Sequence, residues 1–127
     1  MSLRSDLGRV KGLGSAKEGV GHWRLQRLTA IAVLPLSLWF VYSLMAVVGA
    51  PYEAVVGWIA QPHVTVLLLA LVIALFWHLK LGMQVVLEDY IHAPGLQIAA
   101  QVLLRAFAGL GALVAVVSIL KISVGMN

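Results

Sequence analysis

The chain has 127 residues, of which 61% are hydrophobic and 11% charged, with a formal net charge of +4. A soluble domain of this size would have to display an apolar surface patch, whereas a lipid bilayer accepts such a surface as its solvent. The composition therefore favours a membrane protein, and its basic residues indicate orientation in a bilayer and not nucleic-acid binding. Because no cysteine is present, the chain holds no disulfide, thiolate zinc site or iron–sulfur cluster of its own.

Residues 1–27 are polar and glycine-punctuated, and we interpret them as a basic arm at the membrane surface, with a short helical approach from His22. The arm carries six basic residues against two acidic ones: Arg4, Arg9, Lys11, Lys17, Arg24 and Arg27 against Asp6 and Glu18. It contains no compact apolar core, so we expect it not to be a cleavable secretory signal.

Three apolar segments follow the arm, at about residues 28–48, 64–87 and 103–122. Each is long enough for the roughly 20 helical residues that cross a hydrocarbon core. Pro35 falls inside the first segment and predicts a kink rather than a break, because neighbouring groups can satisfy the freed carbonyl. We therefore predict an all-α, integral membrane domain over residues 28–127, in which three transmembrane helices form an up-down-up bundle.

The distribution of basic residues predicts how this bundle is oriented. The arm holds six Lys and Arg residues, whereas the connector at 49–62 holds none. The positive-inside rule then places the N-terminus and the 88–95 turn on the cytoplasmic (or matrix) side, and the C-terminus on the opposite side. Three helices make a thin bundle, so we expect at least one face to pack on another membrane subunit.

His78 is the polar residue that matters most in the second segment. If Asp89 marks the headgroup boundary, His78 lies about 16 Å deeper along the same helical stripe, near the bilayer midplane. Intramembrane ionisable residues are functional candidates, and imidazole is an axial ligand of haem iron. Gly82, one turn on, would let a porphyrin approach the backbone. The alternative is that His78 bonds a neighbouring helix, with Gly82 as a small packing residue.

Other polar residues near the cytoplasmic boundary have two interpretations each. His22 and Arg27 either bind phospholipid headgroups or neutralise haem propionates. Asp89 and Tyr90 are either an ordinary interfacial pair or a site in which the phenol bonds a lipophilic carbonyl. Lys80 shares a face with Gln84 and Glu88, and it either snorkels into a cleft or pairs with an anionic group.

Two stretches together resemble a known family. "LQRLTAIAVLPLSLWF" opens the first span and "HLKLGMQVVLEDYIH" closes the second, and the chain is similar in both to the small cytochrome b-type membrane anchors of succinate dehydrogenase, respiratory complex II. The resemblance implies that His78 ligates a haem b shared with a second membrane chain, that Tyr90 bonds ubiquinone with support from Asp89, and that Arg27 lies at the propionate end. Some members of the family carry an acidic residue at the position aligned with His22, so this chain departs from their pattern there. For His22 itself we predict a contact with a haem propionate.

The family also implies the partners and the setting. The implied partners are a second, cytochrome b-type membrane chain, an iron–sulfur protein, a flavoprotein and the lipid bilayer. The second membrane chain would supply the other haem ligand. The implied location is a bacterial inner membrane in preference to a mitochondrial one. Succinate chemistry would occur on the partners, because this chain carries no flavin or iron–sulfur motif; it would not be catalytic alone. Two other classes stay open: a haem-free structural anchor or assembly factor, and a small proton- or solute-conducting protein with His78 and Lys80 on its pathway.

Overall fold

The structure is a computed structural model that describes residues 6–7 and 17–125, without the side chains of residues 17–19. Four helices follow one another along the described chain: α2 (Lys17–Val47), α3 (Tyr52–Ile59), α4 (Pro62–Tyr90) and α5 (Pro94–Ser123). No strand occurs among the described residues. The predicted all-α class is therefore confirmed.

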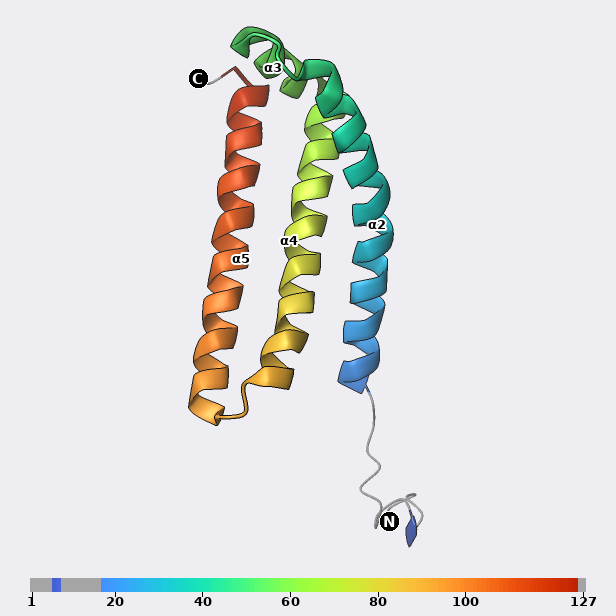
Figure 1. The fold of residues 1–127 in the computed structure, drawn as a ribbon, viewed down its shortest axis with the longest axis vertical. Helices are drawn as coiled ribbons and strands as arrows, with labels where there is room; N and C mark the ends of the chain where they lie inside the picture. The colour runs from blue at the N-terminus through green and yellow to red at the C-terminus, as the bar shows by residue number, and fades with distance from the viewer. Residues whose placement is uncertain (1–5, 8–16, 126–127) are drawn as a thin grey trace.

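Three long helices, α2, α4 and α5, lie side by side with α4 in the middle (Figure 1). Each is long and apolar enough to cross a membrane, and their directions alternate along the chain. Residues 91–93 join α4 to α5 at one end of the bundle, here called the turn end; α3 covers the opposite end, here called the α3 end. This is the predicted up-down-up arrangement.

The helices extend further than the predicted spans. α2 starts within the predicted basic arm, whose residues 1–5 and 8–16 lie outside the described part of the chain. α5 starts at Pro94, well before the predicted residue 103, because proline suits the first helical turn, where its missing N–H costs nothing. Hydropathy indicates where a chain enters hydrocarbon, whereas helical hydrogen bonding continues into the headgroup region. The 49–62 connector likewise contains the short helix α3.

Local features of the sequence set the helix ends. α2 runs unbroken through Pro35, as predicted, and is visibly bowed in Figure 1. It ends just before Gly49, whose φ of 77° is left-handed, and α5 ends in the same way before Gly125, with a φ of 74°. Glycine adopts this conformation without a Cβ penalty and therefore terminates helices efficiently.

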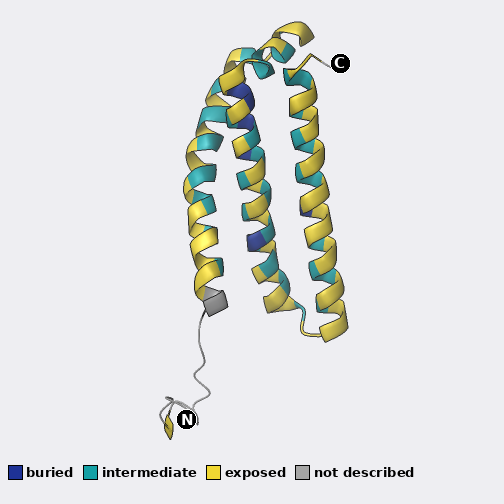
Figure 2. Cartoon of the chain, turned by 180° about the vertical axis from the view of Figure 1, so that it is seen from behind, coloured by how far each residue is buried: buried dark blue, intermediate teal, exposed yellow. Residues whose placement is uncertain are grey.

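Burial is concentrated on α4. A third of its most apolar window (33%) is buried, against 6% in α5 and none in α2. The buried residues are Val64, Thr65, Leu68, Leu71, Leu81 and Ala108, and most of them lie on α4 toward the α3 end. Figure 2 shows exposed residues along the outer faces of all three long helices. These apolar faces require lipid or other membrane chains to cover them.

Polar and aromatic contacts hold the α3 end together. The Thr65 hydroxyl lies 2.7 Å from the Ile59 carbonyl and 3.1 Å from the Ser123 hydroxyl oxygen, so it links α4 to the end of α3 and to α5. Trp39 of α2 stacks on Trp58 of α3, with ring centroids 6.5 Å apart. These contacts therefore lie at the end of the bundle away from the residues predicted to be functional.

Candidate functional site

The candidate site lies between α2 and α4, in the half of the bundle nearer the turn end. The Nδ1 atom of His78, on α4, is 3.0 Å from the hydroxyl oxygen of Thr29, on α2. Among the described residues this is the only hydrogen bond of the imidazole. His78 is half-buried, so the structure places it at a helix–helix contact and not on an outer face.

Thr29 determines which ring nitrogen of His78 is available. Its hydroxyl oxygen also lies 2.8 Å from the Leu25 carbonyl and 3.1 Å from the Gln26 carbonyl, both of which accept only. A hydroxyl has one hydrogen. When Thr29 donates it to a carbonyl, the Nδ1–H of His78 donates to the Thr29 oxygen. The Nε2 atom then has a lone pair that can bind a metal. Metal-bound histidines usually have this arrangement, in which the other ring nitrogen donates a hydrogen bond to the protein.

Two further polar side chains of α2 share the face of Thr29. His22 and Gln26 precede it at seven and three residues, which places all three within one stripe of the helix. The Nε2 atom of His22 and the Oε1 atom of Gln26 are buried and have no hydrogen-bond partner in the described chain. Buried polar atoms are usually paired, so this stripe has unused hydrogen-bonding capacity beside His78.

Gly82 lies on the same face of α4 as His78 and opposite Gln26. A Cβ atom added to Gly82 would come within 3.8 Å of the Gln26 Nε2, an ordinary contact distance. Space for one methyl group therefore exists here between α2 and α4. Packing within this chain does not by itself require glycine at this position.

The structure does not bring Arg27 to this face. Its side chain is exposed and stacks on Trp23, with the guanidinium carbon 5.3 Å from the ring centroid. At 100° per residue it lies about 160° around α2 from Thr29. A contact between Arg27 and a group held at His78 would need to reach around the helix, and its propionate role stays a prediction.

Asp89 and Tyr90 lie at the turn end of α4. Both are exposed, Tyr90 by 81%, and neither bonds another described residue. Asp89 lies about 20° around α4 from His78 and Tyr90 about 120°, with Tyr90 about 18 Å away along the axis. The structure thus separates a deep imidazole from a shallow carboxylate and phenol, as two distinct levels of the bundle.

Lys80 lies on the opposite face of α4, toward α5. Its Nζ atom is 4.3 Å from the centroid of the Trp77 ring. Farther along that face, the Gln84 amide donates to the Glu88 carboxylate at 3.1 Å. Of the three residues predicted to share this face, Gln84 and Glu88 are therefore joined by a hydrogen bond. The face that they form with Lys80 points away from His78.

Sequence reasoning missed the pairing of Thr29 with His78 and the place of Gln26 beside it. The sequence alone does not show how deep one helix stands beside another. The available signal was the antiparallel arrangement itself, which pairs polar residues that interrupt otherwise apolar helices. No cluster of three or more histidine or acidic side chains occurs among the described residues.

The fold and these side chains define a multi-pass helical membrane protein with an imidazole held between two spans. Residues 1–120 match the family described as succinate dehydrogenase/fumarate reductase transmembrane subunits. The chain therefore belongs to this family, as its sequence motifs predicted.

Individual relatives agree with the family match. The succinate dehydrogenase hydrophobic membrane anchor subunit of Rickettsia bellii is 40% identical over 89 residues, covering 70% of this chain and 71% of the relative. The succinate dehydrogenase membrane anchor subunit of Reclinomonas americana is 30% identical over 95 residues, covering 72% and 79%. The Rickettsia typhi anchor subunit is 29% identical over 105 residues, covering 83% and 84%.

Proposed function

We propose that the chain is the membrane anchor of a succinate:ubiquinone oxidoreductase, in which His78 is one axial ligand of a haem b. Tyr90 and Asp89 contribute part of the site where ubiquinone is reduced. The names of the relatives support the type of enzyme. The hydrogen bond between Thr29 and the Nδ1 atom of His78 is the observation that carries the haem assignment.

The residues around His78 fit an iron porphyrin. Nε2 of His78 has no partner in the described chain. On the facing stripe, Nε2 of His22 and Oε1 of Gln26 are buried atoms without a hydrogen-bond partner among the described residues. His78 would hold the iron, Thr29 would fix the ring orientation, and His22 would bond a propionate. The second axial imidazole would come from a partner chain. A bound haem b would supply one-electron redox chemistry at this depth of the membrane.

Tyr90 and Asp89 serve the quinone from the turn end. The phenol of Tyr90 donates a hydrogen bond to a quinone carbonyl oxygen and stabilises the negative charge that develops there during reduction. Asp89 supports that site and helps to bring protons from the aqueous side. Both side chains are exposed in this chain, so a partner chain would complete the pocket.

The partners follow from the chemistry that this chain lacks. Succinate oxidation requires a flavoprotein and an iron–sulfur protein, and haem ligation requires a second, cytochrome b-type membrane chain. The exposed outer faces of the three long helices offer surfaces for that chain and for lipid. We place the turn end on the cytoplasmic side of a bacterial inner membrane, because α2 begins at this end and the basic residues of the N-terminal arm precede it or lie in its first three turns.

One observation also fits a haem-free anchor. A hydrogen bond between helices stabilises membrane bundles in its own right, so Thr29 and His78 could act as a packing contact alone. The two functions differ in one respect, because only the first requires a ligand on Nε2.

Replacing His78 by leucine tests the haem assignment. In the complex purified with its partners, His78→Leu removes the ligand, so we expect the dithionite-reduced b-type absorption to be lost or strongly shifted. His92→Leu is the matched control, since His92 is exposed at the turn end and should leave the spectrum unchanged. An unaltered spectrum and midpoint potential in His78→Leu would exclude ligation by His78 and leave it as a packing contact. Absence of b-type absorption from the unmodified complex would favour the haem-free anchor.

Replacing Tyr90 by phenylalanine tests the quinone assignment. Removing one hydrogen bond to developing charge should lower quinone reduction by about 100- to 1,000-fold, as for a single lost oxyanion donor. Succinate oxidation with an artificial dye should stay at the wild-type rate, because it bypasses the quinone. Equal losses in both assays would indicate misassembly of the complex.

A further inference from the structure

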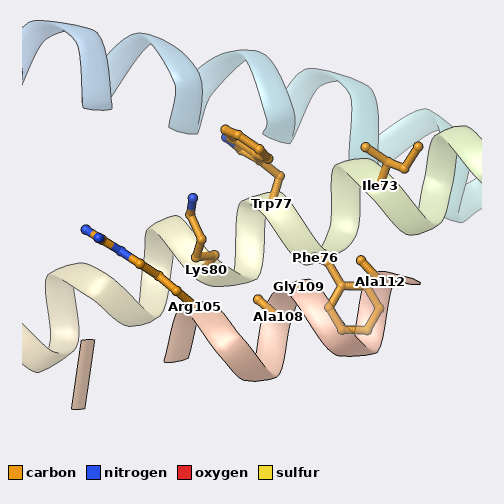
Figure 3. A pocket seen from close by; sticks show the side chains of 8 residues that line it. All are labelled: Ile73, Phe76, Trp77, Lys80, Arg105, Ala108, Gly109 and Ala112. Atoms are coloured by element: carbon orange, nitrogen blue, oxygen red, sulfur yellow. The ribbon is translucent and has the colours of Figure 1, made fainter. Parts of the chain in front are cut away.

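A groove between α4 and α5 is chemically distinct from the His78 face. It encloses a cavity of about 310 Å³ whose walls are apolar toward the α3 end and cationic toward the turn end (Figure 3). Ile73 and Phe76 of α4 and Ala112 of α5 line the apolar part, and Lys80 and Arg105 line the cationic part. The groove therefore has the polarity of an amphiphile whose charged group is anionic.

Neither cation of the groove is neutralised within the described chain. Lys80 makes only its contact with Trp77, and no ion pair joins Arg105 to another described residue. Glu88 is the acid that faces the neighbouring part of the groove, and its carboxylate accepts from the Gln84 amide instead. Two adjacent cations beside apolar walls are costly in a membrane unless an anion offsets them.

The depth of the two cations suits a lipid phosphate. Lys80 lies about 15 Å from the turn end of α4, and Arg105 lies about 16 Å from the start of α5. Both helices are about as long as a whole bilayer with its headgroups, so snorkelling side chains at this depth bring their charges to the hydrocarbon boundary. In Figure 3 the Arg105 side chain extends toward the turn end, away from the apolar part of the groove.

Beyond Arg105 a second cavity of about 470 Å³ continues toward the turn end. It presents hydrogen-bond acceptors: the Glu88 carboxylate and the Oε1 atom of Gln101, which is buried and without a partner in the described chain. The other end of the Gln101 amide is held, because Nε2 donates to the Gln84 carbonyl at 3.4 Å. Acceptors at this position suit a headgroup that carries hydroxyl donors.

We propose that the α4–α5 groove binds one anionic phospholipid with a hydroxylated headgroup, of the phosphatidylglycerol class. The phosphate lies between Lys80 and Arg105, the headgroup hydroxyls donate to Glu88 and Gln101, and an acyl chain follows the apolar groove past Gly109. The lipid belongs to the leaflet at the turn end. This site is independent of haem, because it lies on the face of α4 opposite His78.

Lipid titration of the assembled complex tests the proposal. The complex, purified with its partner chains and delipidated in detergent, is titrated with dioleoylphosphatidylglycerol, and bound lipid is counted by native mass spectrometry. At about 1 kcal/mol per basic residue, the double variant Lys80→Gln/Arg105→Gln should bind about 30-fold more weakly at one site per anchor chain. The charge-preserving pair Lys80→Arg/Arg105→Lys should retain binding, and so should Lys121→Gln, which removes a cation at the α3 end.

Filling the groove gives an independent measurement. Gly109→Leu extends a side chain into open space, since a Cβ at Gly109 meets no atom within 4 Å, and it should weaken lipid binding without altering charge. This variant also decides the matter if the double variant fails to assemble. The proposal is overturned if binding is unchanged in Gly109→Leu and in any double variant that assembles. Equal binding of dioleoylphosphatidylethanolamine would overturn the assignment to an anionic lipid.

Discussion

The two helices that flank α4 meet it differently near its middle. Toward α5 the contact there is close and apolar, with Ala108 buried and the Phe76 ring lying over Gly111, and the hydrogen bonds that join these two helices lie nearer their ends. Toward α2 the contact is polar, with Thr29 and His78 joined by a hydrogen bond. One helix thus combines a closely packed face with a face that carries the proposed haem ligand.

The difference follows from how helices associate in lipid. Without a hydrophobic driving force, close approach at small residues provides van der Waals contact, and this is the contact that α4 and α5 make near the middle of the bundle. A hydrogen bond between membrane helices adds only about 0.6 to 2 kcal/mol. That gain does not explain why the α2–α4 interface leaves the polar atoms of His22 and Gln26 unpaired. These unpaired atoms support the proposal that a bound group completes the polar interface.

The largest effect on packing should come from adding one methyl group at Gly111. A Cβ at this position would lie 2.6 Å from Cε1 of Phe76, so the ring must move. Overpacking of this kind costs about 1 to 3 kcal/mol, and Gly111→Ala should lower the thermal stability of the purified complex accordingly. Gly109→Ala is the matched control on the same helix, because its Cβ meets nothing within 4 Å.

A second substitution identifies the cause of the Gly111 effect. If the ring is responsible, shortening it in the double variant Gly111→Ala/Phe76→Leu should recover part of the lost stability. Equal stabilities for Gly111→Ala and Gly109→Ala would show that α5 does not approach α4 as closely as the structure indicates.

The next largest effect concerns the polar interface, through Thr29. Thr29→Val keeps the shape of the side chain but removes the oxygen that bonds Nδ1 of His78. Loss of the hydrogen bond that orients a metal ligand typically weakens metal binding by about 10- to 100-fold. We therefore expect haem to dissociate more readily from the complex and its midpoint potential to shift, while the complex remains assembled.

Thr29→Ser provides the control, because it retains the hydroxyl and should preserve both the haem affinity and the potential. A spectrum and potential that are identical in Thr29→Val and Thr29→Ser would separate Thr29 from the haem site. That result would mean that the hydrogen bond between Thr29 and His78 serves only as a contact between the two helices.

Features that belong to a single helix could be predicted from the sequence, whereas features that depend on how two helices stand beside each other could not. The three spans and their alternation follow from hydropathy, and His78 stands out because it is an ionisable residue within a single apolar segment. The contact with Thr29 depends on the relative depth of two helices, which hydropathy leaves undetermined. The helix ends were missed for a related reason, since the apolar windows stop before the hydrogen bonding does, as Pro94 shows. The α4–α5 groove likewise appears only when Lys80 and Arg105 are brought to the same depth.

The smallest effect on packing should come from a glycine-to-alanine substitution at Gly82, on the α2 side of α4. It contrasts with the same substitution at Gly111, on the α5 side. A Cβ at Gly82 meets Gln26 Nε2 at an ordinary 3.8 Å, so Gly82→Ala should change the stability of the complex by less than about 1 kcal/mol. A porphyrin that approaches the backbone beside His78 would nevertheless meet this methyl group, and the haem content per assembled complex should fall. Pyridine haemochromogen assay against protein concentration measures this ratio. Full haem content in Gly82→Ala would show that the glycine serves only the contact with α2, and that the porphyrin edge lies elsewhere on the face.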